Sequence, residues 1–186
     1  MTATATPPTM PASQPPPRRT PWRYVIIIVV VLFAAFWIWA LFFASKEAVN
    51  KIGDEAWTVR AQGICEAADT QRLQLADMRR VNDDDAAMLA ERGDIVDKAT
   101  DIVERMLDDV VAVTPTDPKG QAIVPDWARD YRTYIEDRRE FAADLRAGKN
   151  EPFAETAVDG IPISDKLTVF AGDNRMPDCA PPIDLA

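Results

Sequence analysis

A run of 21 uncharged and mostly large apolar residues, from Tyr24 to Ala44, constrains this chain more than any other feature. As a helix with a rise of about 1.5 Å per residue, the run would extend about 31 Å, which is close to the thickness of the hydrocarbon core of a bilayer. Its β-branched stretch, Val25 to Val31, would suit a buried strand, but no strand in a globular domain is this long. The sequence therefore predicts one transmembrane helix at residues 24–44.

The charges on either side of this segment predict its orientation. Arg18, Arg19 and Arg23 precede it, whereas charges of both signs follow it. By the positive-inside rule, residues 1–23 stay in the cytoplasm and residues 45–186 are translocated. The apolar core exceeds the roughly 7–15 residues of a cleaved signal peptide, and no A-x-A cleavage pattern follows it. We therefore expect an uncleaved signal anchor in the cell membrane, with the lipid bilayer as the first partner.

Charge and composition exclude several classes of function. All 30 acidic residues follow the hydrophobic run, together with 18 of the 21 basic ones, so residues 45–186 carry a net charge of −12. Such a surface repels nucleic-acid phosphates. The chain has no histidine, the usual general base and transition-metal ligand, and its seven glycines form no phosphate-binding loop. We expect no enzyme, no catalytic residue, no cofactor and no metal site, with a carboxylate-dependent hydrolase as the remaining enzymatic alternative.

Residues 1–23 form a proline-rich tail, with seven prolines in the first 21 positions and almost no large apolar side chain. Such a segment buries too little surface to offset its ordering entropy, so the sequence predicts a disordered cytoplasmic tail. Its Pro8 to Pro11 stretch matches the loose P-x-x-P pattern. A solvated tail and a segment that recruits a cytoplasmic partner are both compatible with this pattern.

Three amphipathic helices are predicted after the anchor, near residues 48–80, 85–113 and 125–148. The positions of their predicted buried stripes recur at spacings of three and four. These positions are Trp57, Ala61, Ile64, Ala68, Gln71, Leu75 and Met78, then Ile95, Ala99, Ile102, Met106, Val110 and Val113, then Trp127, Tyr131, Tyr134, Phe141 and Leu145. Since no strand of useful length is evident, the sequence predicts an all-α fold, a small antiparallel three-helix bundle with an irregular C-terminal tail. Within that tail, residues 164–172 could form a short helix capped by Ser164.

The second predicted helix carries an acidic face opposite its apolar one. Its residues are Asp94, Asp97, Asp101, Glu104 and Asp108. Carboxylates one turn apart can bind Ca²⁺, but a calcium loop folds several oxygens around the ion, and Asn82 to Asp85 lacks that pattern. We interpret the acidic residues as a solvated face.

The aromatic residues and one arginine on the predicted core faces could bind a ligand or a partner instead of only packing in the core. Trp57, Trp127, Tyr131 and Tyr134 could line a ligand groove, although aromatic residues at helical spacing more often pack in a core. Arg138 fills the one polar gap in the third stripe. It could extend to the edge of the stripe, pair with an acidic residue or mark where a polar partner docks.

Cys65 and Cys179 are the two cysteines, and the predicted topology places both outside the cytoplasm. An even number in an oxidising compartment favours a disulfide that pins the tail to the first helix. Two free thiols and an intermolecular bond are the alternatives. A zinc site with two cysteines and no histidine would need carboxylate ligands, so we do not expect one.

The first predicted helix contains the pattern W-x-x-R-A-x-x-I-C, formed by Trp57, Arg60, Ala61, Ile64 and Cys65, and Cys179 follows late in the chain. In this pattern and the late cysteine, the chain resembles uncharacterised single-pass or lipid-anchored envelope proteins of high-GC Gram-positive bacteria. The resemblance covers about a quarter of the part after the anchor. It implies an envelope location and a disulfide.

Together these features predict a non-enzymatic, membrane-anchored envelope protein that serves as an accessory or interaction module of a membrane or cell-wall assembly. Another envelope protein is then the expected partner, and the sequence gives no oligomeric state. The alternative is a ligand-binding or sensory ectodomain, which requires a pocket among the aromatic residues of the first and third helices.

Overall fold

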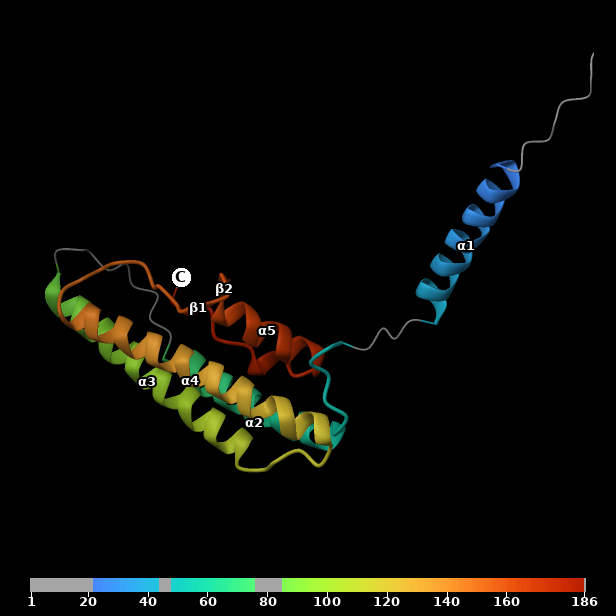
Figure 1. The fold of residues 1–186 in the computed structure, drawn as a ribbon. Helices are drawn as coiled ribbons and strands as arrows, with labels where there is room; N and C mark the ends of the chain where they lie inside the picture. The colour runs from blue at the N-terminus through green and yellow to red at the C-terminus, as the bar shows by residue number, and fades with distance from the viewer. Residues whose placement is uncertain (1–21, 44–47, 76–84, 186) are drawn as a thin grey trace, which may run out of the picture. The chain divides into compact units, whose positions relative to one another are not determined.

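The computed structural model describes residues 22–43, 48–75 and 85–185, and five helices hold most of these residues (Figure 1). The chain divides into two units, residues 1–46 and residues 47–186. The first unit contains helix α1, and the second, the C-terminal unit, contains all the other elements.

Helix α1 (Trp22–Phe42) has the length and composition of a membrane span. Its most apolar window has a mean hydropathy of 3.0, and none of its side chains is buried within the protein. At about 1.5 Å per residue its 21 residues can cross the hydrocarbon core of a bilayer. The predicted apolar helix is thus present, and it begins two residues earlier than expected. Ala44, the last residue of the prediction, lies outside the described residues.

Each of the three long helices of the C-terminal unit begins after an aspartate that acts as its N-cap. The helices are α2 (Glu55–Leu73), α3 (Ala86–Val111) and α4 (Pro118–Arg146). The capping bonds run from Trp57 N to Asp54 Oδ1 (2.9 Å), from Met88 N to Asp85 Oδ1 (3.0 Å) and from Gly120 N to Asp117 Oδ2 (2.8 Å). A side-chain oxygen that accepts a free N–H of the first turn fixes where a helix starts.

Two predicted helix starts are wrong because these caps lie elsewhere. Helix α2 starts seven residues later than expected. Residues 48–54 instead run outside the helix, where Ile52 N donates to the side chain of Asn174 (2.7 Å). Helix α4 starts seven residues earlier, at Pro118, where a proline in the first turn loses no helical hydrogen bond. Pro125, the expected start, lies inside the helix at an exposed position, where water can solvate the carbonyl group that the proline leaves unpaired.

The N-terminal ends of α2 and α4 are tied together by their caps. Asp54 N donates to Asp117 Oδ1 (3.2 Å), and Thr116 donates to Asp54 Oδ2 through both its backbone N–H (2.9 Å) and its hydroxyl group (2.7 Å). The Thr116 hydroxyl, followed by the backbone N–H groups of Thr116 and Trp57, lowers the pKa of Asp54 from 3.8 to about 2. These bonds hold the two caps in one hydrogen-bonded network.

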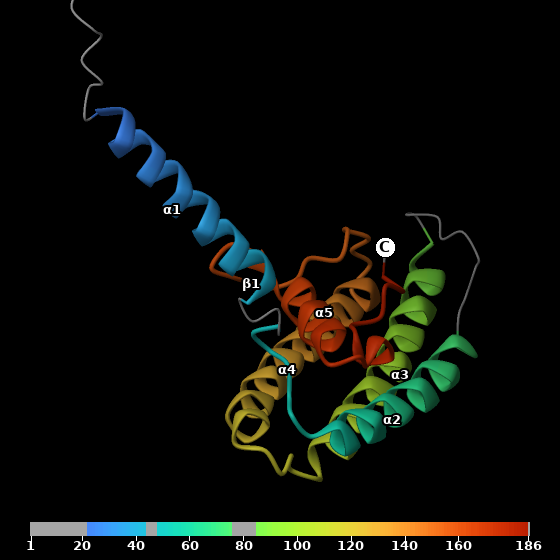
Figure 2. The ribbon, with the colours of Figure 1, turned by 90° about the vertical axis from the view of Figure 1, so that its right-hand side faces the viewer.

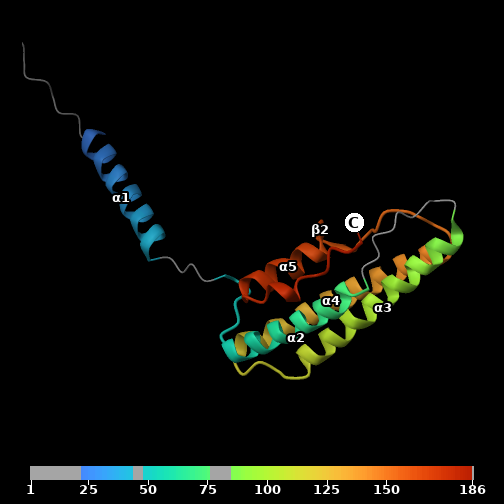
Figure 3. The same ribbon diagram turned by 180° about the vertical axis from the view of Figure 1, so that it is seen from behind.

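The buried face of α3 coincides only in part with the predicted one. Ala99, Met106 and Val110 are buried as expected. Val96, Val103 and Leu107 are buried, whereas the expected core residues Ile95 and Ile102 are only partly buried. Val113, also expected in the core, lies beyond the helix and is 50% exposed. Helix α3 packs against both α2 and α4, which lie beside it in Figures 2 and 3, so its core face is broad.

The acidic face of α3 is not a simple solvated face. Arginines at seven-residue intervals on α4 form ion pairs with it. The pairs are Asp108 with Arg132 (3.8 Å), Asp101 (2.9 Å), Glu104 (2.6 Å) and Asp97 (3.5 Å) with Arg139, and Asp94 (2.8 Å) and Asp97 with Arg146. The acidic residues of these pairs have decreasing numbers along α3 as the arginines have increasing numbers along α4. We call this set of residues the α3–α4 seam.

Close contact between α3 and α4 depends on a glycine within α3. Gly93 is buried, and a Cβ atom there would lie 2.8 Å from the carbonyl oxygen of Ala142. Since backbone atoms cannot move aside cheaply, a larger residue would push the helices apart.

The remainder of the chain folds against α4 and α2. Two strands of two residues, β1 (Ala157–Val158) and β2 (Ile161–Pro162), pair around Asp159 and Gly160. Both turn residues have positive φ, as a two-residue hairpin turn requires. Helix α5 (Ile163–Asp173) and the short 3₁₀-helix η1 (Pro177–Cys179) follow. The sequence predicted neither the hairpin nor η1. The predicted short helix is present, but Pro162 rather than Ser164 occupies its N-cap position.

Candidate functional site

The C-terminal unit contains a cavity of about 650 Å³ between α4, α5, the loop after α4 and the C-terminal tail. Its lining consists of Arg92, Tyr134, Phe141, Asn150, Glu151, Pro152, Phe153, Glu155, Ser164, Asp165, Thr168, Pro181, Pro182, Ile183 and Leu185. Cavities of this size hold small organic ligands, and they usually combine an apolar lining with a few polar groups, as here.

Three aromatic rings form part of the apolar lining. Phe153, from the loop after α4, lies between two residues of α4. Its ring is 6.0 Å from that of Tyr134 and 5.6 Å from that of Phe141, both in edge-to-face geometry. Such contacts add to the stability gained from burying the rings, so we expect this surface to be rigid.

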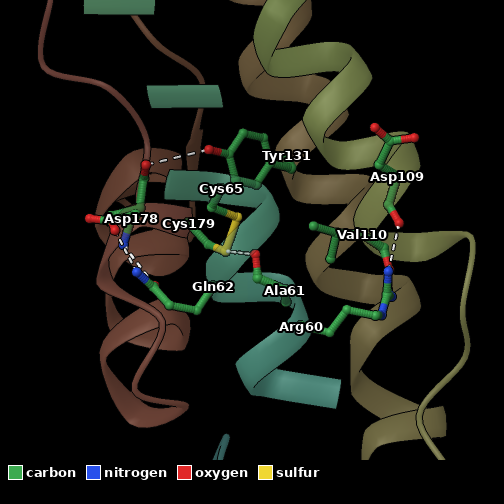
Figure 4. The surroundings of a disulfide bond; sticks show 10 residues. Arg60, Ala61, Gln62, Cys65, Asp109, Val110, Tyr131, Asp178 and Cys179 are labelled. Carbon is green, nitrogen blue, oxygen red and sulfur yellow. Dashed lines mark hydrogen bonds between the residues drawn. A yellow bond between two sulfur atoms is a disulfide. The ribbon is translucent and has the colours of Figure 1, made fainter. Parts of the chain in front are cut away.

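The C-terminal tail provides another wall, and a disulfide fixes its beginning. Cys65 of α2 is bonded to Cys179 with a Cα–Cα distance of 5.1 Å, and both residues are fully buried (Figure 4). This confirms the predicted pairing. Beside it, Asp178 N donates to Gln62 Oε1 (3.2 Å), and Gln62 Nε2 donates back to the Asp178 carboxylate.

An ion pair fixes the other end of the tail. The Arg138 side chain is fully buried, and it donates to both carboxylate oxygens of Asp184 (2.7 and 3.2 Å) and to the Thr100 hydroxyl (3.0 Å). Arg72 also pairs with Asp184 (3.1 Å). Burial raises the pKa of Asp184, but the hydrogen bond and charge of Arg138, aided by Arg72, outweigh it and hold the pKa below 3.8. Of the alternatives for Arg138, the structure thus shows pairing with an acidic residue.

Two further contacts hold the middle and the end of the tail. Tyr134 donates its hydroxyl hydrogen to the carbonyl oxygen of Pro182 (2.9 Å), and Leu185 is buried among apolar residues of α3 and α4. In contrast, Ile183 between them is 93% exposed at the rim of the cavity. The tail is therefore part of the fold, while one of its large apolar side chains remains free.

Helix α5 forms the wall that faces the loop. Its first turn is bound by Glu155, which accepts hydrogen bonds from Ser164 N (2.8 Å) and Ser164 Oγ (2.7 Å). Glu155, which lies in the loop before the hairpin, therefore caps the first turn of α5. Asp165 and Thr168, also on α5, are exposed and complete this wall.

The charged groups of the lining differ in whether they have partners. Both oxygens of Glu155 are engaged by Ser164. Within the described part of the chain, the side chains of Arg92, Glu151 and Asp165 form no hydrogen bond or ion pair, although the charge of Glu151 adds to the hydrogen bond and charge of Asp144 in raising the pKa of Lys149. Their charges are available to a ligand.

The aromatic residues considered from the sequence are mostly core residues. Trp57, Trp127 and Tyr131 are at most 3% exposed and do not line the cavity, and burial raises the pKa of Tyr131. Tyr134 alone of the four contributes to it. Among residues 22–43, 48–75 and 85–185, no cluster of three or more metal-binding side chains occurs.

Comparisons with known proteins give no relative for this chain. No protein-family model, no curated protein and no solved structure matches it.

Proposed function

We propose that this protein is a single-pass membrane protein of the cell envelope whose C-terminal unit is a non-enzymatic binding module outside the cytoplasm. In this proposal α1 is an uncleaved anchor and α2, α3 and α4 form an antiparallel three-helix bundle. The bundle is the scaffold of the cavity. Another envelope component, either a small molecule or part of an assembly, provides the ligand.

The cavity is the observation that carries the proposal. It is large enough for an organic ligand, and the disulfide and the Arg138–Asp184 pair fasten its tail wall. A wall that is fixed before binding lowers the ordering cost of binding. The absence of histidine, the usual general base near neutral pH, favours binding over chemistry.

The orientation of the anchor can be tested with reporter fusions. A reporter that is active only in the cytoplasm should work when fused before Arg18 and fail when fused after Ala186. The opposite pattern would place the cavity in the cytoplasm and remove the envelope from the proposal.

Binding can be tested by native mass spectrometry of the full-length protein extracted in mild detergent. We expect a non-covalently bound compound that is released on denaturation. Thr168→Trp, which fills the cavity from an exposed position of α5, should abolish this adduct. Val169→Trp is the matched control, because Val169 is the next residue on α5, is 55% exposed and does not line the cavity. An adduct that is equal in both variants would exclude the cavity as the binding site.

A sensory role is the second candidate, and the position of α5 favours it. The first half of α5 lines the cavity. At its other end, the side chain of Asn174 accepts from Ile52 N (2.7 Å) and donates to the carbonyl oxygen of Asn50 (3.0 Å). One helix therefore contacts both the ligand site and the segment that leads toward the anchor.

Hydrogen exchange at the Ile52 amide can test this coupling. Its bond to Asn174 should protect it in the wild-type protein. If α5 transmits occupancy of the cavity, Thr168→Trp should change this protection and Val169→Trp should not. Equal exchange in the two variants would argue for a binding module without signal transmission.

A further inference from the structure

We propose that the cavity binds an organic cation, namely an ammonium group carried on an aromatic or aliphatic body. This inference rests on the proposed binding function and specifies the chemical class of its ligand. Three sets of observations support it: the aromatic surface, the charges of the lining and the charge of the whole unit.

The aromatic surface favours an apolar body with a positive charge. Phe141 and Phe153 offer apolar contact, and the faces of aromatic rings attract cations electrostatically. The third ring, Tyr134, already has a cation near it, because the Arg138 guanidinium carbon lies 5.8 Å from its centroid. The protein itself therefore places a cation near one of these rings.

The charges of the lining are mostly negative. Three carboxylates, those of Glu151, Glu155 and Asp165, face the cavity together with one cation, Arg92. The Glu155 carboxylate is engaged by Ser164, so Glu151 and Asp165 are the groups that can pair with a ligand. They come from different elements, the loop after α4 and the first turn of α5.

The positive charge of Arg92 leaves the net charge of the cavity lining negative. Arg92 lies on α3, and it also lines a second, smaller cavity that contains Arg72 and Asp184. Residues 45–186 carry a net charge of −12, which raises the local concentration of cations and lowers that of anions. An anionic ligand would have a single cation to pair with in an acidic environment.

Three probes with one carbon skeleton can test the charge preference. They are 3-phenylpropylamine, 3-phenylpropanol and 3-phenylpropionate, titrated into the full-length protein in bilayer discs of zwitterionic lipid. Ligand-observed NMR would measure binding, with the Thr168→Trp protein in the same discs as the background. We expect the amine to bind more tightly than the alcohol by about threefold or more, and the acid to bind most weakly.

Substitutions that remove charges show whether the preference for the amine arises from the cavity. Glu151→Gln combined with Asp165→Asn should lower the affinity for the amine to that for the alcohol, and Arg92→Gln should raise it. Glu66→Gln combined with Glu136→Gln is the matched control. It removes two negative charges at exposed positions outside the cavity, so it should leave the preference for the amine over the alcohol unchanged.

Several results would overturn the inference. One is tightest binding of the acid with loss in Arg92→Gln, and another is equal affinity for all three probes. Loss of the preference for the amine in the control variant would assign it to the overall charge and not to the cavity. If native mass spectrometry still detects a cavity-dependent compound in any of these cases, the binding module stands and the organic cation alone is rejected. If Thr168→Trp alters neither the adduct nor the probes, both proposals fail.

Discussion

Arg138 and Arg139 are neighbours on α4 and both pair with carboxylates, yet they belong to different regions of the molecule. The Arg138 side chain is fully buried and its partner Asp184 is 24% exposed, whereas Arg139 is 38% exposed and its partners Asp101 and Glu104 about half exposed. The first pair fastens the tail that lines the cavity. The second belongs to the α3–α4 seam.

Helical geometry separates the two arginines. Arg138 lies seven residues from Tyr131 and from Leu145, on the buried face of α4. Arg139 lies seven residues from Arg132 and from Arg146, on the seam. A rotation of about 100° per residue thus places one guanidinium in the core and the next at the surface. The difference teaches that burial, rather than residue type, decides what an ion pair contributes, because a buried charge without a partner is costly and an exposed one is solvated.

Removing the disulfide should have the largest effect and would test how strongly the tail is fastened. Its cysteines are 114 residues apart, and the chain-entropy model gives about 5 kcal/mol for a loop of that length. We expect Cys65→Ala combined with Cys179→Ala to lower the free energy of unfolding by about 4–5 kcal/mol. Denaturant unfolding followed by near-ultraviolet circular dichroism measures this. A loss below about 1 kcal/mol would show that the other contacts hold the tail without the disulfide.

Asp184→Asn should have the next largest effect, because it leaves the buried guanidinium of Arg138 without its anion. Loss of one partner of a buried pair typically costs about 3–5 kcal/mol, and the partial exposure of Asp184 favours the lower end. The variant should also weaken cavity binding, since the tail is one of its walls. Unfolding and native mass spectrometry of the same sample measure both effects. A variant as stable as the wild type would mean that Arg138 is solvated.

Arg139→Gln should change stability by less than about 1 kcal/mol, although Arg139 forms more ion pairs than Arg138 does. Its contribution should also fall as salt concentration rises, because exposed charges are screened. Unfolding at low and high salt measures this. A loss as large as that of Asp184→Asn would contradict the contrast between the two regions.

The smallest expected effect is a change in the pH dependence of stability at the caps of α2 and α4. The pKa of Asp54 is lowered in the folded state to about 2, so its contribution is present above the unfolded value of 3.8 and is lost as the pH falls toward 2. Asp54→Asn should therefore lose less stability than the wild type between about pH 5 and about pH 3. Thermal melts at the two pH values measure this difference. An equal loss of stability in the two proteins would show that the Thr116 bonds to Asp54 are weak in solution.

The sequence predicts that the long helices exist, but it misplaces the starts of α2 and α4 and part of the buried face of α3. Apolar residues occur as adjacent pairs along α3, such as Ile95 with Val96 and Ile102 with Val103. A periodicity of three and four residues fits either member of each pair, and packing against two helices selected Val96 and Val103. The start of α4 was predictable, because Asp117 followed by Pro118 has the chemistry of an N-cap and a first turn.

The cavity could not be predicted from the sequence, because its walls come from segments far apart in the chain. The sequence suggests a partner for Arg138, but nothing in the local pattern singles out Asp184 among 30 acidic residues. The α3–α4 seam had a readable signal, the seven-residue spacing of Arg132, Arg139 and Arg146. Phe153 gave none, because it lies in a loop without periodicity. Tertiary packing alone brings it between Tyr134 and Phe141.

The contrast between Arg138 and Arg139 is tested most directly by two double-mutant cycles in the full-length protein. One combines Arg138→Met with Asp184→Asn, and the other combines Arg139→Gln with Asp101→Asn. The buried pair should show a coupling energy of about 2 kcal/mol or more, and the exposed pair less than about 0.5 kcal/mol. Equal coupling energies, or a larger one for Arg139 with Asp101, would contradict the claim that a buried ion pair fastens the tail as a wall of the cavity.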